Sequence, residues 1–306
     1  TSGHFNVGVH VDQTSTTINS TGGNITVTGQ GGGSGISAFN FGVLVQNSAV
    51  VSAGGSGLVL VMGTGGTNST GENNAGVGVH TANATITSNS GNVTIIGQGG
   101  GLGSSPYNYG VWVQSSGVIT SGGTGIVSVQ GTGGASGGGF NYGLFMNGAN
   151  SRITSSGGNV SVNGQGGGSG SSINNHGVFI QAAAFISAGL NGTVNVEGTG
   201  GATTGNFNAG VFVSDANSRI ASSGGNVSVI GQGGGSVSSS NNVGVYILSG
   251  AVVSAGVNGT VFVQGSGGTT GGFGYGVYLG GANTAITSSG GNVTVTGIEG
   301  GGPSGL

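Results

Sequence analysis

Residues 156–172 read SGGNVSVNGQGGGSGSS, and close copies of this stretch begin near Gly22, Ser90, Gly224 and Gly290. Seven of its seventeen residues are glycine, and none is charged. Between two glycine clusters, valine alternates with small or polar residues, which is the pattern of a short β-strand bounded by turns. Five copies of one such stretch predict a repeat protein.

The repeat extends over the whole chain as a second motif, Asn-x-Gly-Val-x-Val, with its variants. The intervals between its successive glycines are 34, 34, 34, 33, 34, 33, 34 and 32 residues. The nine motif glycines are Gly8, Gly42, Gly76, Gly110, Gly143, Gly177, Gly210, Gly244 and Gly276. Nine units leave no room for a second domain, so we predict a single domain over residues 1–306.

Two types of unit alternate along the chain. One contains the quoted stretch and opens at Gly8, Gly76, Gly143, Gly210 and Gly276. The other contains sequences such as VVSAGGSGLVLVMGTGGT and opens at Gly42, Gly110, Gly177 and Gly244. The full sequence repeat is therefore a pair of units.

Each unit contains three short segments of alternating apolar and polar residues and no helical periodicity, so the predicted fold is all-β. The second segment has one strong apolar position, occupied by Ile18, Val51, Ile86, Ile119, Ile153, Ile186, Ile220, Val253 and Ile286. One unit alone offers about five core side chains, too few to exclude water, whereas stacked units bury them in continuous columns. We therefore predict a parallel β-solenoid of about nine coils, right-handed as parallel crossovers are.

The composition is unusual for a folded protein, with 79 glycines, two prolines and no cysteine among 306 residues. Collagen is excluded because glycine does not recur at every third position, and the regular placement of Val and Ile argues against disorder. Arg152 and Arg219 are the only Lys or Arg residues and the net charge is −3, so we expect no nucleic-acid partner. No apolar run reaches the roughly 18 residues of a membrane helix, so we expect no membrane insertion by this segment.

Asparagine forms a second column, always two residues before a motif glycine. Its members are Asn6, Asn40, Asn74, Asn108, Asn141, Asn175, Asn208 and Asn242. Asn tolerates left-handed turns, and its amide can bond to an identical amide one coil away. A structural amide ladder is the predicted role. A further set precedes the third strand in alternate units: Asn24, Asn92, Asn159, Asn226 and Asn292.

Catalytic and cofactor sites are not expected. The carboxylates are scattered over different units as Asp12, Glu72, Glu197, Asp215 and Glu299, whereas acid–base catalysis needs two groups close to one substrate. The sequence GQGGGSG lacks the Asp of calcium-binding repeats and the Lys of phosphate loops. We predict a protein that is not an enzyme and has no cofactor.

Histidine offers no convincing metal site. His10 and His80 lie two units apart at unequal positions after the motif glycine, which disfavours a chelate. We expect them, with His4 and His176, to be surface residues.

Aromatic residues occupy the position between the two inward side chains of the first strand from the fourth unit onward. They are Trp112, Phe145, Phe179, Phe212, Tyr246 and Tyr278. We favour a stacked ladder partly covered by the long loops, and the alternative is an exposed lateral interface for another rod or a carbohydrate. A related column before the Asn column should cap the core: Phe5, Phe39, Tyr107, Phe140, Phe207 and Phe273.

The alternation of GGNVTVTGQGGGSG with the second unit type resembles the Gly/Ser/Thr/Val-rich β-strand repeats of long bacterial surface and secreted proteins. It is similar, more distantly, to filamentous-haemagglutinin and autotransporter passenger solenoids. This resemblance implies an extracellular or cell-surface, fibrous protein. The lack of Lys and Cys agrees with an inert extracellular rod.

We therefore expect a structural fibre or surface-filament protein whose partner is itself, stacked end to end, with lateral assembly of rods as a further option. Thr1 is not an initiator Met and neither end offers an obvious cap, so the chain is expected to be a segment or subunit of a longer fibre. The alternative is an adhesin that binds glycan or a host cell surface through the aromatic residues or loops. A weaker alternative is ice binding, disfavoured because the third strand presents a mixture such as Thr26, Leu60, Ser128, Asn195 and Phe262.

Overall fold

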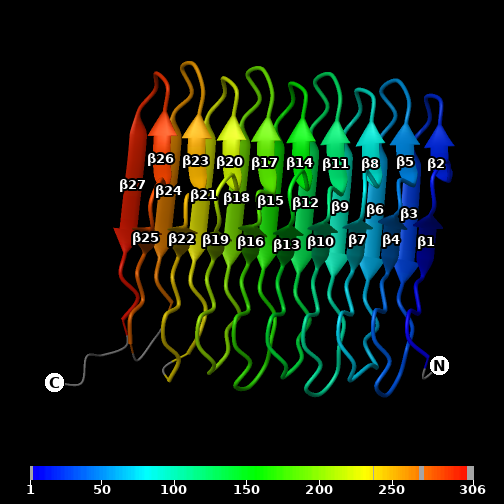
Figure 1. Ribbon diagram of the computed structural model, residues 1–306, viewed down its shortest axis with the longest axis horizontal. Helices are drawn as coiled ribbons and strands as arrows, with labels where there is room; N and C mark the ends of the chain where they lie inside the picture. The colour runs from blue at the N-terminus through cyan, green and yellow to red at the C-terminus, as the bar shows by residue number, and fades with distance from the viewer. Residues whose placement is uncertain (1–2, 237, 269–271, 302–306) are drawn as a thin grey trace.

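The computed structural model describes residues 3–236, 238–268 and 272–301 and forms a β-solenoid of nine coils (Figure 1). Each coil contributes one strand to each of three parallel sheets, and no helix occurs in the described residues. The predicted all-β solenoid with three strands per coil is confirmed. The expectations about Thr1 and Leu306 concern positions outside the described residues.

Sheet A contains the first strand of every coil. Its strands are β1 (Val9–Asp12), β4 (Val43–Gln46), β7 (Val77–His80), β10 (Val111–Gln114), β13 (Leu144–Asn147), β16 (Val178–Gln181), β19 (Val211–Val213), β22 (Val245–Leu248) and β25 (Val277–Gly280).

Sheet B contains the second strands and lies in front in Figure 1. Its strands are β2 (Thr17–Ser20), β5 (Val50–Ala53), β8 (Thr85–Ser88), β11 (Val118–Ser121), β14 (Arg152–Ser155), β17 (Phe185–Ala188), β20 (Arg219–Ser222), β23 (Val252–Ala255) and β26 (Ala285–Ser288).

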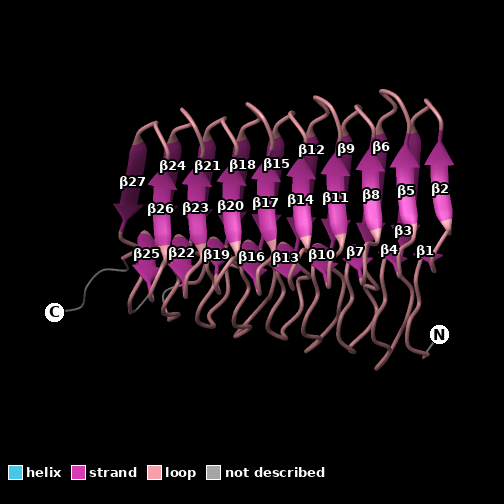
Figure 2. Ribbon diagram, turned by 45° about the horizontal axis from the view of Figure 1, so that its top comes forward, coloured by secondary structure: helices cyan, strands magenta, loops and turns pink. Residues whose placement is uncertain are grey.

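Sheet C contains the third strands and runs along the side opposite sheet B (Figure 2). Its strands are β3 (Ile25–Gln30), β6 (Val59–Thr64), β9 (Val93–Gln98), β12 (Val127–Thr132), β15 (Val160–Gln165), β18 (Val194–Thr199), β21 (Val227–Gln232), β24 (Val261–Ser266) and β27 (Val293–Ile298).

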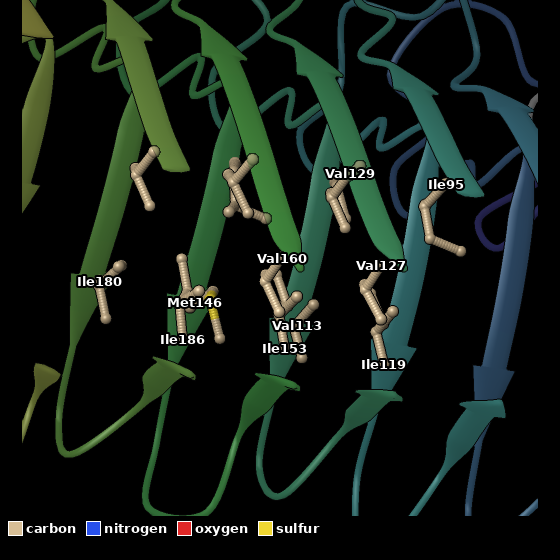
Figure 3. Close-up of a cluster of buried hydrophobic side chains, with 14 of the residues drawn as sticks. Ile95, Val113, Ile119, Val127, Val129, Met146, Ile153, Val160, Ile180 and Ile186 are labelled. Atoms are coloured by element: carbon tan, nitrogen blue, oxygen red, sulfur yellow. The ribbon is translucent and has the colours of Figure 1, made fainter. Parts of the chain in front are cut away.

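Equivalent residues of successive coils lie in register, as the repeat predicts. Ile119 pairs with Ile153, which pairs with Ile186. These side chains point into the space enclosed by the three sheets, which we call the lumen (Figure 3). The lumen is lined by Val, Ile, Leu, Met and Ala, and in the middle coils its side chains are almost fully buried. Strand alternation thus places one apolar column above another, and their burial holds the coils together.

A pair of glycine columns closes the lumen where the third strand of one coil meets the motif glycine that follows it. A Cβ atom at Gly164 would overlap the carbonyl oxygen of Gly177, and one at Gly143 would overlap the backbone nitrogen of Gln165. We call this contact the glycine seam. The motif glycines are therefore explained by close approach of two backbones rather than by left-handed backbone angles.

The turns between the second and third strands alternate in length. Odd-numbered coils have four-residue turns, at 21–24, 89–92, 156–159, 223–226 and 289–292, whereas even-numbered coils have five-residue turns, at 54–58, 122–126, 189–193 and 256–260. The loops above β5, β11, β17 and β23 accordingly rise higher than their neighbours in Figure 1. The two unit types of the sequence are thus two turn types in the structure.

Candidate functional site

The long loops that connect the coils enclose the asparagine column. Each loop is tied to the next by backbone bonds, such as Gly134 N–H to Asn108 C=O (2.9 Å) and Gly167 N–H to Asn141 C=O (2.8 Å). Asn6 is half-buried, and the other seven asparagines are completely buried inside the loops. The loops are therefore an ordered continuation of the solenoid.

The asparagine side chains form a continuous amide ladder from Asn6 to Asn242. In each step the Nδ2 group donates to the Oδ1 atom of the next coil, over distances from 2.6 Å at Asn40 to 3.2 Å at Asn208. Serine hydroxyls donate to the same oxygens, as from Ser172 to Asn175 at 3.0 Å. Buried donors and acceptors need hydrogen-bond partners, and each amide of the ladder provides them for polar groups of two coils.

The ladder stops at the eighth coil. Gly274 occupies the ninth position of the column, and the Nδ2 group of Asn242 donates instead to the Ser239 hydroxyl at 2.6 Å.

The outward aromatic column of sheet A is covered rather than exposed. Trp112, Phe145, Phe179 and Phe212 are each 8–9 % exposed, and their rings stack along the rod, most closely between Phe179 and Phe212 at 4.6 Å with an interplanar angle of 7°. These four rings form a stacked and covered ladder, which is the interpretation that we favoured, rather than the exposed stripe of the alternative. Only Tyr246, half-buried, and Tyr278, 36 % exposed, reach the surface.

The cover consists of residues that sequence reasoning did not single out. Tyr109 and Tyr142 each stand directly before a motif glycine. Tyr109 packs edge-on to Trp112, and Tyr142 packs edge-on to Phe179. Burial raises the pKa of both tyrosine hydroxyls. The spacing of Tyr109 and Tyr142, one repeat apart, is the signal that could have revealed this second column.

The aromatic column that directly precedes the asparagine column divides into two groups. Tyr107, Phe140 and Phe207 pack outside the lumen, against what we call the aromatic cluster: Phe41, Tyr109, Trp112, Tyr142, Phe145, Phe179 and Phe212, with the aromatic rings in contact with them. The remaining members are exposed: Phe5, Phe39 and Phe273.

Two histidines expected at the surface are buried. The His80 ring fills the place left by Gly78, the glycine rung of the aromatic column, and lies 4.4 Å from the Trp112 ring. His176 stacks on Tyr142 at 5.1 Å, and its Nδ1 atom accepts the backbone N–H of Ala209. Burial lowers the pKa of each imidazole to about 3. The expectation of surface positions was wrong because aromatic packing, not metal binding or solvation, uses these rings.

Among the described residues, two buried side-chain nitrogens have no hydrogen-bond partner: Nε2 of His80 and Nε1 of Trp112. Both belong to the aromatic cluster, which is therefore held mainly by ring packing rather than by hydrogen bonds.

A pocket of about 350 Å³ opens where the aromatic column emerges at coils 8 and 9. It is lined by Phe207, Asn241, Val243, Tyr246, Tyr275 and Tyr278. The Tyr246 and Tyr278 rings meet edge-on at 5.1 Å, and Tyr275 and Tyr278 are tilted at 5.3 Å. Its lining thus combines ring faces, phenolic hydroxyls and one amide. We call it the tyrosine pocket.

Charged groups form no comparable centre. Within the described ranges, no three His, Cys, Asp or Glu side chains gather as metal ligands, and the one ion pair joins His10 to Asp12 at 3.6 Å. The Arg219 guanidinium lies 3.9 Å above the Phe185 ring and so packs on sheet B.

The outward face of sheet C is mixed in character. The register places Thr26 beside Leu60, and Phe262 beside Ser228 and Thr294. A flat threonine array does not form on it. In the described part of the chain, no helix is long and apolar enough to span a membrane.

The free face of coil 9 exposes side chains that are buried in every inner coil. Val293 and Val295 are 45 % and 47 % exposed, whereas Val261 and Val263, one coil earlier in the same register, are 1 % and 0 % exposed. Leu279 is exposed in the same way, whereas its register partner Ile247 is fully buried. The backbone edges of β25, β26 and β27 on this side have no neighbouring strand among the described residues.

Comparison of the chain with protein-family models, with curated proteins and with solved structures finds no match. The resemblance to bacterial surface repeats therefore rests on the repeat pattern alone.

Proposed function

We propose that the chain is a structural section of an extracellular fibre or surface filament, extended by further β-coils stacked on its end faces. The supporting observation is the free face of coil 9, where an aliphatic lumen and three strand edges stand open. Such edges favour pairing with another strand, and an open apolar column favours a further coil. Nine coils in one register supply the rod itself.

The composition supports an extracellular location. The chain has no cysteine, only two basic residues besides histidine, and five carboxylates. Few charged side chains leave little for trypsin-like proteases or ionic ligands to recognise. The carboxylates are scattered over different coils, and we propose a non-enzymatic role.

Immunogold electron microscopy of intact producing cells tests this function. An antibody against the exposed turns should label thin surface fibres along their length. Label confined to the cell interior, or to round particles, would contradict the proposal.

The tyrosine pocket supports a second candidate function, that of an adhesin. Aromatic ring faces can stack on the apolar faces of sugar rings, while the Asn241 amide and tyrosine hydroxyls can bond to sugar hydroxyls. Its volume is at the lower end of the range for ligand sites.

Glycan-array binding with paired variants tests the adhesin function. Tyr278→Ala and Tyr275→Ala should each reduce binding about tenfold or more, because each removes a ring of the pocket. Tyr107→Ala, a half-buried tyrosine outside the pocket, is the matched control. Absence of any bound glycan, or equal binding by all three variants, would exclude the pocket as the adhesive site.

A further inference from the structure

The eight interfaces between coils all join a four-residue turn to a five-residue turn. Four-residue turns occur only in odd coils and five-residue turns only in even coils. In the first seven coils the last residue of the third strand alternates between Gln and Thr as well, as from Gln165 to Thr199 to Gln232. No interface between two coils of the same type exists in the described chain.

The asparagine of each four-residue turn recognises the five-residue turn of the coil that follows. The Oδ1 atoms of Asn24, Asn92, Asn159 and Asn226 accept the backbone N–H groups of Leu58, Ile126, Thr193 and Thr260, at 2.9 Å in all four cases. The donor is always the last residue of the five-residue turn. The repeated geometry makes this bond a feature of the interface between the two turn types.

Asn292 holds the same place in coil 9 and lies exposed. Its side chain makes no hydrogen bond with the described chain, whose ninth coil has no coil after it. The side-chain carbonyl of Asn292 is therefore presented on the free face of coil 9, beside exposed Val293 and Val295.

A second observation comes from the other end of the rod. The glycine before the asparagine of each later four-residue turn is required, since a Cβ atom at Gly91, Gly158 or Gly225 would overlap a carbonyl oxygen of the five-residue turn in the preceding coil. In coil 1 the same position is Gly23, and a Cβ atom there would meet only the Ser20 hydroxyl, at 3.1 Å. Gly23 thus leaves room that no contact within the described chain uses.

We infer that the free faces of coils 1 and 9 both fit one kind of partner, a β-solenoid coil with a five-residue turn between its second and third strands. This inference rests on the proposed function. Direct stacking of coil 9 on coil 1 would join two four-residue turns, a pairing that none of the eight interfaces of the described chain uses. The end faces therefore select the opposite coil type, and a rod with one face of each type should polymerise head to tail.

Insertions into the full chain test the inference without removing any coil. A second copy of residues 34–67, inserted after Gly301, adds one coil with a five-residue turn and gives a ten-coil chain with unlike ends. A second copy of residues 34–101 adds two coils and restores like ends in an eleven-coil chain. Sedimentation and electron microscopy should find filaments of the ten-coil chain at a critical concentration about tenfold or more below that of the nine-coil and eleven-coil chains.

A substitution within the ten-coil chain sharpens the test. Gly23→Ala should abolish its filaments with little change in the thermal unfolding of the single rod, because within the rod the added methyl group meets only the Ser20 hydroxyl, a side chain that can shift. Gly22→Ala, which meets nothing within 4 Å, is the matched control and should polymerise normally.

The outcomes separate this inference from the proposed function. Equal polymerisation of the nine-, ten- and eleven-coil chains would overturn selection by turn type while supporting stacking of coil ends. A folded ten-coil chain that stays monomeric would overturn the inference, whereas the fibre function would still be decided by immunogold labelling of native material.

Discussion

The lumen and the loops share one register but are stabilised by different chemistry. In the lumen, Val, Ile, Leu and Met replace one another at equivalent positions, as in Val113, Met146 and Ile180. In the loops, asparagine recurs unchanged in eight coils. Hydrophobic burial is non-directional and tolerates such variation, whereas an amide ladder needs a donor and an acceptor at fixed places in every coil.

The glycine seam joins these two regions, and breaking it should have the largest effect. Gly164→Ala places a methyl group against the Gly177 carbonyl, where backbone rather than a flexible side chain would have to move. We expect a loss of about 4 kcal/mol or more in the free energy of unfolding, or failure to fold. Urea unfolding followed by circular dichroism measures it. Gly22→Ala, with open space around it, should cost under about 1 kcal/mol; equal losses for both variants would refute a role for the seam.

A cavity in the lumen should have the next largest effect. Ile153 is fully buried between Ile119 and Ile186, so Ile153→Ala should cost about 3 kcal/mol, and Ile153→Val under about 1.5 kcal/mol. An outward residue of the same coil provides the control, since Ser161→Ala on β15 should change the free energy of unfolding little. A loss for Ile153→Ala no greater than that for Ser161→Ala would mean that the lumen does not hold the coils together.

The lumen is the region that the sequence predicted best. Counting in steps of about 34 residues aligns the nine apolar positions from Ile18 to Ile286. The strand period of two then determines which side chains face the lumen. The fold follows from that alignment. The motif glycines were located correctly, but the seam that requires them involves two backbones separated along the chain and was visible only in three dimensions.

The surface sites were harder to predict because burial outside the lumen depends on how the loops fold back. Trp112 alternates with inward valines and should face outward, as it does, yet Tyr109 and its neighbours cover it. His80 was placed at the surface because the sequence does not reveal that Gly78 leaves a space for its ring. Alternation thus gives the direction of a side chain but not its exposure.

Interrupting the amide ladder should lower the free energy of unfolding by less than a cavity in the lumen does, but by more than the loss of one exposed hydrogen bond does. Asn141→Ala removes the acceptor for Asn108 and the donor to Asn175, leaving buried polar groups unsatisfied, and should destabilise the rod by about 2 to 3 kcal/mol. Asn163→Ala removes an exposed asparagine and is the control. Hydrogen exchange should increase locally in the loops of coils 4 to 6. An increase spread evenly over all nine coils would indicate that the ladder does not act as a local element.

The smallest expected effect is a loss of stability in acid. It should arise in the aromatic cluster, which contains the two buried imidazoles of His80 and His176, and not in the lumen, which contains none. The folded pKa of His80 and His176 is about 3, below the ordinary value of about 6.5. Above pH 6.5 both the folded and the unfolded states are neutral at these positions. As the pH falls below 6.5 the unfolded state binds protons first, so stability is lost down to about pH 3.

At pH 5.5 this loss should be about 1.4 kcal/mol for each imidazole relative to pH 8. Urea unfolding at the two pH values measures it, and the variant His80→Phe with His176→Phe should remove most of the difference. His10→Gln changes an exposed histidine and is the control that should retain it. The lumen contains no imidazole and should therefore keep the coils stacked at pH 5.5. A pH dependence that persists in the double Phe variant would assign the acid sensitivity to the carboxylates instead.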